Sequence, residues 1–141
     1  MSVQDLVRRT SQSRFIRFAT VGTAGFLVNE AALAVAKELL GMGDHAAWFF
    51  GFAISVTFTW WGNRTFTFAD KASDHHIGIL AEWARFVATN SLGAAANFAV
   101  YAACIHYAPW PVSTPYLALA VGTVIGLIFN FTLSKLIVFR D

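Results

Sequence analysis

The chain has 141 residues, of which 57% are hydrophobic and 13% are charged, and its mean hydropathy is +0.56. A soluble domain of this size needs a charged face on nearly every surface helix, and so few charges cannot provide one. The net charge is only +2 and the basic residues are scattered, which argues against nucleic-acid binding. The single cysteine, Cys104, excludes a disulfide framework within one chain. Composition therefore predicts an all-α, polytopic membrane protein.

The sequence contains an internal repeat. Arg17–Asn29 (RFATVGTAGFLVN) is written again as Arg85–Asn97 (RFVATNSLGAAAN), at an offset of 68 residues. At an offset of 71, six further positions have counterparts: Gly51, Ser55, Thr59, Asn63, Arg64 and Phe68 are echoed by Gly122, Gly126, Asn130, Ser134, Lys135 and Phe139. Self-similarity at a fixed period is the signature of a repeated structural unit. We therefore expect a single transmembrane domain, 1–141, that contains two copies of one unit, at about 17–68 and 85–139.

Four apolar segments are each near the length that crosses a bilayer, about 20 residues. They predict transmembrane helices at about 17–40, 46–66, 83–107 and 116–139. The polar segment Asp70–Ile79 reads as the loop between the repeats, and Ala108–Pro115, which holds all three prolines, reads as a stiff connection. Upstream of the first span, apolar residues such as Val3, Leu6 and Val7 favour a short helix lying on the membrane surface.

Lysine and arginine predict the orientation of these helices. Nine of the ten basic residues fall at one set of span ends: Arg8, Arg9, Arg14, Arg17, Arg64, Lys71, Arg85, Lys135 and Arg140. Only Lys37 falls near the other set. By the positive-inside rule, both termini and the central loop are expected in the cytoplasm, in a multi-pass protein of the cell inner membrane. Each repeat then crosses out and back, so the two copies form a parallel repeat.

Two asparagines occupy equivalent positions within the predicted spans. Asn29 and Asn97 lie about 18 Å along their helices from Arg17 and Arg85, near the middle of the hydrocarbon region. A polar residue at that depth costs free energy and needs an explanation. One explanation is hydrogen bonding between packed helices, and the other is a polar lining for a substrate headgroup, to which Asn130 on the fourth helix would contribute. Duplication does not choose between them, because packing and transport would both be duplicated.

Glu30 belongs to one repeat only, since its counterpart is Phe98. A carboxyl group within a span is either neutral or paired with a cation, and the nearest cation on its own helix, Lys37, is two turns away. The functional interpretation is proton coupling or headgroup binding. The alternative is a polar residue near the outer interface that reaches water.

A quartet of cations, Arg17, Arg64, Arg85 and Lys135, is predicted at the cytoplasmic ends, two from each repeat. Arginine binds phosphate through two parallel hydrogen bonds, so such a quartet could collect a lipid phosphate, with Asn63 beside it. The alternative is that these residues only anchor the topology. We find no Walker loop, no zinc-ligand spacing and no nucleophile elbow in the sequence. We therefore expect no enzyme activity, no catalytic residues, no metal and no cofactor.

These residues resemble the GtrA-like family of small four-helix membrane proteins. The resemblance covers roughly Phe15 to Phe139 and rests on both repeat openings, on NRTFTF at Asn63–Phe68 and on NFTLSKLIVF at Asn130–Phe139. The chain departs from the family pattern at Thr59-Trp60, where an Asn-Phe pair is typical. It also departs at Ser134-Lys135, where the second residue is usually arginine.

The resemblance implies translocation of a polyprenyl-phosphate-linked sugar for cell-surface polysaccharide synthesis, beside the membrane glycosyltransferase that makes it. Carried onto this sequence, the residues contacting the lipid phosphate or sugar would be Arg17, Asn29, Glu30, Asn63, Arg64, Arg85, Asn97, Asn130 and Lys135. The alternative function is a non-transporting anchor or accessory subunit of the glycosyltransferase. Four short helices leave little room for a headgroup in a monomer, which favours either this alternative or a homo-oligomer. A proton-coupled drug exporter is disfavoured, because those exporters have weak charge bias.

Overall fold

A computed structural model describes residues 1–139, and Arg140 and Asp141 lie outside the described residues. The described residues are helical and contain no strand. The α-helices are α1 (Val3–Ala34), α2 (Asp44–Gly62), α3 (His76–Tyr107) and α4 (Pro115–Leu133). Three of them continue into π-helical segments, η1 (Val35–Leu39), η2 (Asn63–Thr67) and η4 (Ser134–Val138), and a 3₁₀ turn, η3 (Ala69–Lys71), follows η2.

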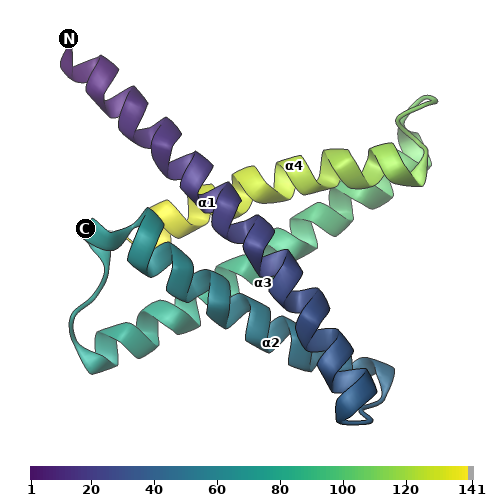
Figure 1. The fold of residues 1–141 in the computed structure, drawn as a ribbon. Helices are drawn as coiled ribbons and strands as arrows, with labels where there is room; N and C mark the ends of the chain where they lie inside the picture. The colour runs from purple at the N-terminus through teal and green to yellow at the C-terminus, as the bar shows by residue number, and fades with distance from the viewer. Residues whose placement is uncertain (140–141) are drawn as a thin grey trace. The chain divides into compact units, whose positions relative to one another are not determined.

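The chain divides into two compact units, and the boundary between them falls within α3. Met1–Trp83 makes the first unit, and the described residues from Ala84 onward make the second. In the first unit α1 and α2 run antiparallel and side by side, and in the second the remainder of α3 pairs in the same way with α4 (Figure 1). Each unit therefore holds one of the two copies that the sequence repeat predicts.

Both α1 and α3 begin earlier than the spans predicted from hydrophobicity. Ser2 caps α1 by accepting a hydrogen bond from the Asp5 amide at 3.2 Å, while the Asp5 carboxylate accepts from the Ser2 amide at 3.1 Å. This reciprocal capping box starts a helix that continues without a break into the apolar segment. The prediction of a separate surface helix upstream of residue 17 was therefore wrong. Likewise α3 begins at His76, within the predicted loop.

The packing repeats as the sequence does. Phe18 meets Phe68 edge-on with ring centroids 6.4 Å apart, and their counterparts Phe86 and Phe139 meet at 6.4 Å as well. All four rings are buried. The π-helical segments η2 and η4 also occupy equivalent positions, and each ends with the amide of its closing phenylalanine bonded to the carbonyl five residues earlier. The structural repeat thus includes the π-helical segment at the end of the second helix of each copy.

Glycines let the paired helices approach closely. A Cβ placed on Gly25 would overlap the Thr59 side chain, and a Cβ on Gly51 would lie 2.7 Å from Oδ1 of Asn29. In the second unit the equivalent glycines, Gly93 and Gly122, sit against the equivalent residues, Asn130 and Asn97. Small residues that bring backbones together are the usual means of helix association in lipid.

The exterior of the protein is apolar. Large side chains such as Phe26, Phe49 and Phe98 are more than 60% exposed. Within the described residues, two helices are long and apolar enough to cross a membrane by length and composition, Val3–Leu39 and Ala120–Val138. So many large exposed apolar side chains on long apolar helices are suited to lipid and not to water. The chain is therefore a membrane protein.

Candidate functional site

Several charged residues of the first unit lie around the segments that follow α2, namely η2 and η3. Two arrangements lie there, a buried ion pair centred on Glu82 and an open cleft lined by arginines. Both are formed entirely within the first unit.

Glu82 is almost completely buried, with 2% of its side chain exposed, and several donors surround it. Arg64 Nη1 donates to both carboxylate oxygens at 2.9 and 3.0 Å, and Trp60 Nε1 donates to Oε1 at 3.1 Å. The backbone amide of Ser73 donates to Oε2 at 2.9 Å, and Arg64 Nη2 donates a hydrogen bond to the Ser73 carbonyl. A buried carboxylate is tolerated only when it is paired and hydrogen-bonded in this way.

This ion pair changes the role expected for Arg64. The sequence placed Arg64 among the phosphate-binding cations, but here Glu82 neutralises its guanidinium and only 17% of its side chain is exposed. Through Ser73, the pair also connects the loop after η3 to η2 and α3. Sequence reasoning missed Glu82. The available signal was an isolated acid in the first turns of an apolar helix, but its partners lie 9 to 22 residues away.

Arg17 takes part in the second arrangement, the cleft. Its Nη1 donates to the Phe66 carbonyl at 3.3 Å, and its Cζ lies 5.2 Å from the centroid of the Phe66 ring. The last carbonyls of a helix have no partner within the helix and carry partial negative charge, so a cation there is stabilising. The end of η2 therefore holds Arg17 in place, and Arg17 lines the cleft while remaining exposed to solvent.

Arg14 lies one turn earlier on α1. It forms an ion pair with Asp70, and its Cζ lies 5.9 Å from the centroid of the buried Phe68 ring. The cleft has a volume of about 510 Å³, and the described residues that line it are Arg9, Thr10, Ser13, Arg14, Arg17, Phe66, Thr67, Ala69 and Asp70. The sequence used Arg9 and Arg14 only to orient the chain. What it missed is that helix α1 extends far enough upstream to bring them beside Arg17.

The second unit holds the other two predicted cations. Arg85 and Lys135 lie at the same end of that unit, beside the Phe86–Phe139 contact. Both are partly buried, and the Nε of Arg85 is buried without a hydrogen-bond partner among the described residues. The quartet is therefore seen as two pairs, one in each unit.

The predicted asparagines pack against glycines. Asn29 lies against Gly51, and Asn97 lies against Gly122. This placement favours the helix-packing explanation for both. Asn63 is buried, and its Oδ1 accepts a 2.7 Å hydrogen bond from the Thr67 hydroxyl inside η2, so its role is local.

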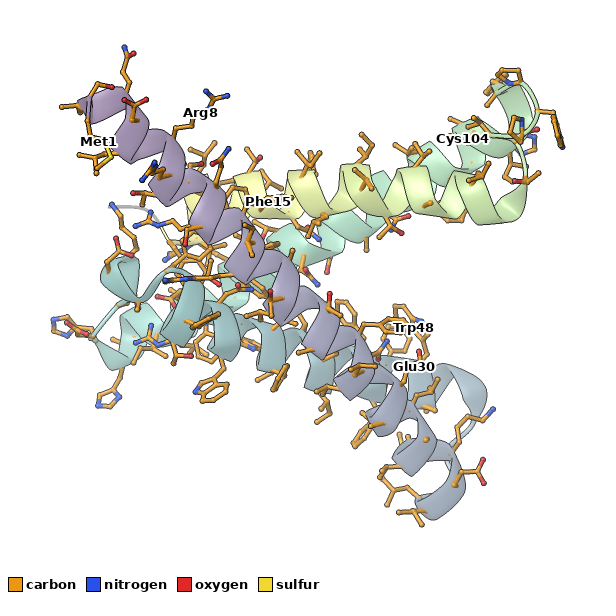
Figure 2. The ribbon with its side chains drawn as sticks, turned by 45° about the horizontal axis from the view of Figure 1, so that its top comes forward. Met1, Arg8, Phe15, Glu30, Trp48 and Cys104 are labelled. Carbon is orange, nitrogen blue, oxygen red and sulfur yellow. The ribbon has the colours of Figure 1, made fainter. Side chains whose placement is uncertain are left out.

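Asn130 also packs against a glycine, Gly93, whereas Glu30 does not. The Oδ1 of Asn130 is buried and has no hydrogen-bond partner in the described part of the chain. Glu30 is exposed on α1, in the half of that helix far from Arg8 (Figure 2). An exposed carboxyl at this position fits either interpretation offered from the sequence.

The comparisons with known proteins agree with the repeat and the packing. A model for the GtrA/DPMS transmembrane domain matches residues 17–139, which is most of the chain. No curated protein matches the chain. Within the described residues, no group of three histidine, cysteine or acidic side chains is arranged to hold a metal ion.

Proposed function

Because the chain belongs to the GtrA/DPMS transmembrane-domain family, we propose that it translocates a polyprenyl-phosphate-linked sugar across the cytoplasmic membrane. The family match connects it to membrane functions that involve polyprenyl-phosphate sugars. Flipping the lipid for cell-surface polysaccharide synthesis is the specific form that we propose. On this proposal the protein moves its substrate without making or breaking covalent bonds, and it needs no cofactor.

The observation that carries this proposal is the arginine-lined cleft at one end of the first unit. Translocation requires a site that collects an anionic headgroup at the membrane surface. Arginine is the residue best suited to bind phosphate, because its planar guanidinium matches two phosphate oxygens at once. The apolar exterior provides the surface along which a polyprenyl tail would lie.

We propose further that all four helices span the membrane, with both termini in the cytoplasm. Cysteines introduced singly at Met42 and Ser113, in a Cys104→Ala background, should react with a membrane-impermeant thiol reagent in intact cells. Cysteines at Ser2 and Ser73 should react only after the inner membrane is opened, because the positive-inside rule keeps those segments in the cytoplasm. Labelling of Met42→Cys and Ser2→Cys from the same side would contradict a first repeat that crosses out and back.

Translocation itself can be measured with purified protein in liposomes that carry a polyprenyl-phosphate sugar. The rate at which headgroups of the inner leaflet become accessible to an impermeant reagent should exceed that of protein-free liposomes. Arg17→Gln should lower the rate about tenfold, because a charge-assisted contact to the phosphate is lost. The matched control is Arg8→Gln, which removes the same charge from the same helix outside the cleft. A wild-type rate equal to that of empty liposomes would contradict the proposal.

The second candidate is an anchor or accessory subunit for a membrane glycosyltransferase. One observation favours it. The first turns of α1 extend past the end of α2, and they expose the apolar side chains of Val3, Leu6 and Val7 (Figure 1). An exposed apolar stripe outside the membrane-spanning segment is suited to contact with another protein, either the glycosyltransferase or a second copy of the chain. Capture of a glycosyltransferase without any headgroup translocation would favour this function.

A further inference from the structure

We propose that the arginine-lined cleft is a binding site for a phosphate group, formed by Arg9, Arg14 and Arg17, and that Asp70 occupies it until phosphate displaces the carboxylate. The proposal adds Arg9 and Arg14 to the site, removes Arg64 from it and assigns Asp70 the role of internal competitor. The inference rests on the proposed function only for the identity of the natural ligand.

The charge and size of the cleft fit phosphate. The described residues that line it include three arginines and one aspartate, which leaves two positive charges to be balanced. Its volume of about 510 Å³ is within the range typical of ligand pockets and exceeds what a phosphate group fills, so an attached sugar or chain has room. Ser13 also lines the cleft, and its hydroxyl can donate a hydrogen bond to a phosphate oxygen, whereas the Thr10 hydroxyl already donates to the Leu6 carbonyl at 2.9 Å.

The two paired carboxylates of the first unit, Asp70 and Glu82, are held very differently, and this decides which of them can leave its arginine. Asp70 is 56% exposed, and its recorded partner is Arg14. Arg14 itself is 18% exposed, but solvent screens the open Asp70 carboxylate, so this ion pair contributes less than one in which both partners are buried. Glu82, by contrast, is buried and bonded to Arg64, Trp60 and the Ser73 amide. The loop is therefore fixed at Ser73. Asp70, in η3 just before the loop, can be displaced from Arg14 by an anion that binds the arginines more tightly.

The position of the cleft on α1 fits a ligand at the membrane surface. The helix and η1 together run for 37 residues, well beyond the roughly 20 that cross a bilayer. Arg9 and Arg17 lie about 12 Å apart along the helix, in the part that precedes the most apolar residues. A phosphate there can come from a lipid headgroup or from solution, and both present the same chemistry to the arginines.

The test uses the full chain in nanodiscs of phosphatidylcholine. Farnesyl phosphate and inorganic phosphate are the two probes, titrated separately and in competition, with affinity measured by calorimetry. Wild-type protein should bind farnesyl phosphate, and Arg14→Gln should weaken binding about tenfold. Arg8→Gln, which lies outside the cleft lining, should change it by less than about twofold. Equal losses in the two variants would overturn the proposal. Displacement by millimolar inorganic phosphate would identify solution phosphate as a ligand, and its absence would identify the lipid headgroup.

Asp70 provides a test by gain of binding, which a misfolded variant cannot imitate. Asp70→Asn should tighten binding of farnesyl phosphate about three- to tenfold, because the competing carboxylate is gone. Asp74→Asn removes the same charge from an exposed position of the same loop, outside the cleft lining. If Asp70→Asn tightens binding no more than Asp74→Asn does, Asp70 is not a competitor.

The outcomes also separate this inference from the proposed function. Phosphate binding that depends on Arg14, in a protein that does not accelerate headgroup translocation, would retain the site and reject the flippase. Translocation that proceeds at the wild-type rate in Arg14→Gln, with unchanged affinity, would retain the flippase and reject the site.

Discussion

Glu82→Ala should lower the free energy of unfolding by about 3–5 kcal/mol, which is the typical cost of removing one partner of a buried ion pair. The substitution leaves the Arg64 guanidinium in a site where 17% of the side chain is exposed, together with unpaired donors on Trp60 and Ser73. Denaturation of the full chain in micelles, followed by circular dichroism, measures the change. Asp70→Ala is the matched control. It breaks an ion pair whose carboxylate is open to water, although Arg14 is not, and should cost about 1 kcal/mol.

A double-mutant cycle separates the energy of the Arg64–Glu82 interaction from the other contacts that each side chain makes. Arg64→Met with Glu82→Ala removes both charges, so no unpaired ion remains buried. We expect the double variant to be more stable than the sum of the two single losses predicts, by about 1–3 kcal/mol, because contacting residues are not additive. Additive losses would show that Arg64 and Glu82 stabilise the fold through separate contacts.

The local features of the fold could be predicted from the sequence. The offsets of 68 and 71 residues predicted which positions correspond, and the structure places Phe18–Phe68 and Phe86–Phe139 in the same edge-on contact. Hydrophobic length located the helices, because a span of lipid-facing residues leaves a continuous apolar signal. It did not locate where α1 and α3 begin. A helix that continues beyond an apolar stretch becomes polar before it ends, and Ser2 with Asp5 was the signal for α1.

The candidate site could be predicted only in part. Arg17 was identified because the repeat duplicates it. Glu82 and Asp70 were not identified, because each is paired with a residue far away in the sequence, and only the fold brings the partners together. The spacing of residues along the sequence does not predict an ion pair between such distant residues. Composition also cannot tell an arginine that is neutralised from one that faces a cleft.

The two units are alike in packing and different in charge. At the shared offset of 68, Arg14 corresponds to Glu82, so a cation in the first copy becomes an anion in the second. Arg14 lines the cleft, while Glu82 lies just before the second unit begins and closes the ion pair with Arg64. Helix packing tolerates this exchange because both residues precede the apolar contacts. The repeat therefore provides a common scaffold, and the chemistry arises where the copies diverge.

Gly25→Ala tests that scaffold and should cost about 1–3 kcal/mol of unfolding free energy, the usual penalty for overpacking a close contact. The added methyl group would overlap Cγ2 of Thr59 on α2, whose hydroxyl is held by bonds to the Ser55 and Val56 carbonyls. Gly22→Ala is the matched control, one turn away on the same helix, where nothing lies within 4 Å of the new Cβ. It should be neutral or stabilising by up to about 1 kcal/mol, because alanine favours helix over glycine.

Thr59→Ser provides the rescue. It removes the Cγ2 methyl that Gly25→Ala would meet and keeps the hydroxyl that bonds to α2, so the double variant should recover most of the lost stability. Denaturation in micelles measures the unfolding free energy of the wild type, of the three single variants and of the double variant under one condition. A Gly25→Ala variant as stable as Gly22→Ala would mean that α1 and α2 do not approach closely here. An unrescued loss would mean that the cost arises elsewhere than at Thr59. Rescue would show that glycine is needed at position 25 because a threonine methyl occupies the space of its Cβ, as the Asn130 side chain does at the equivalent Gly93.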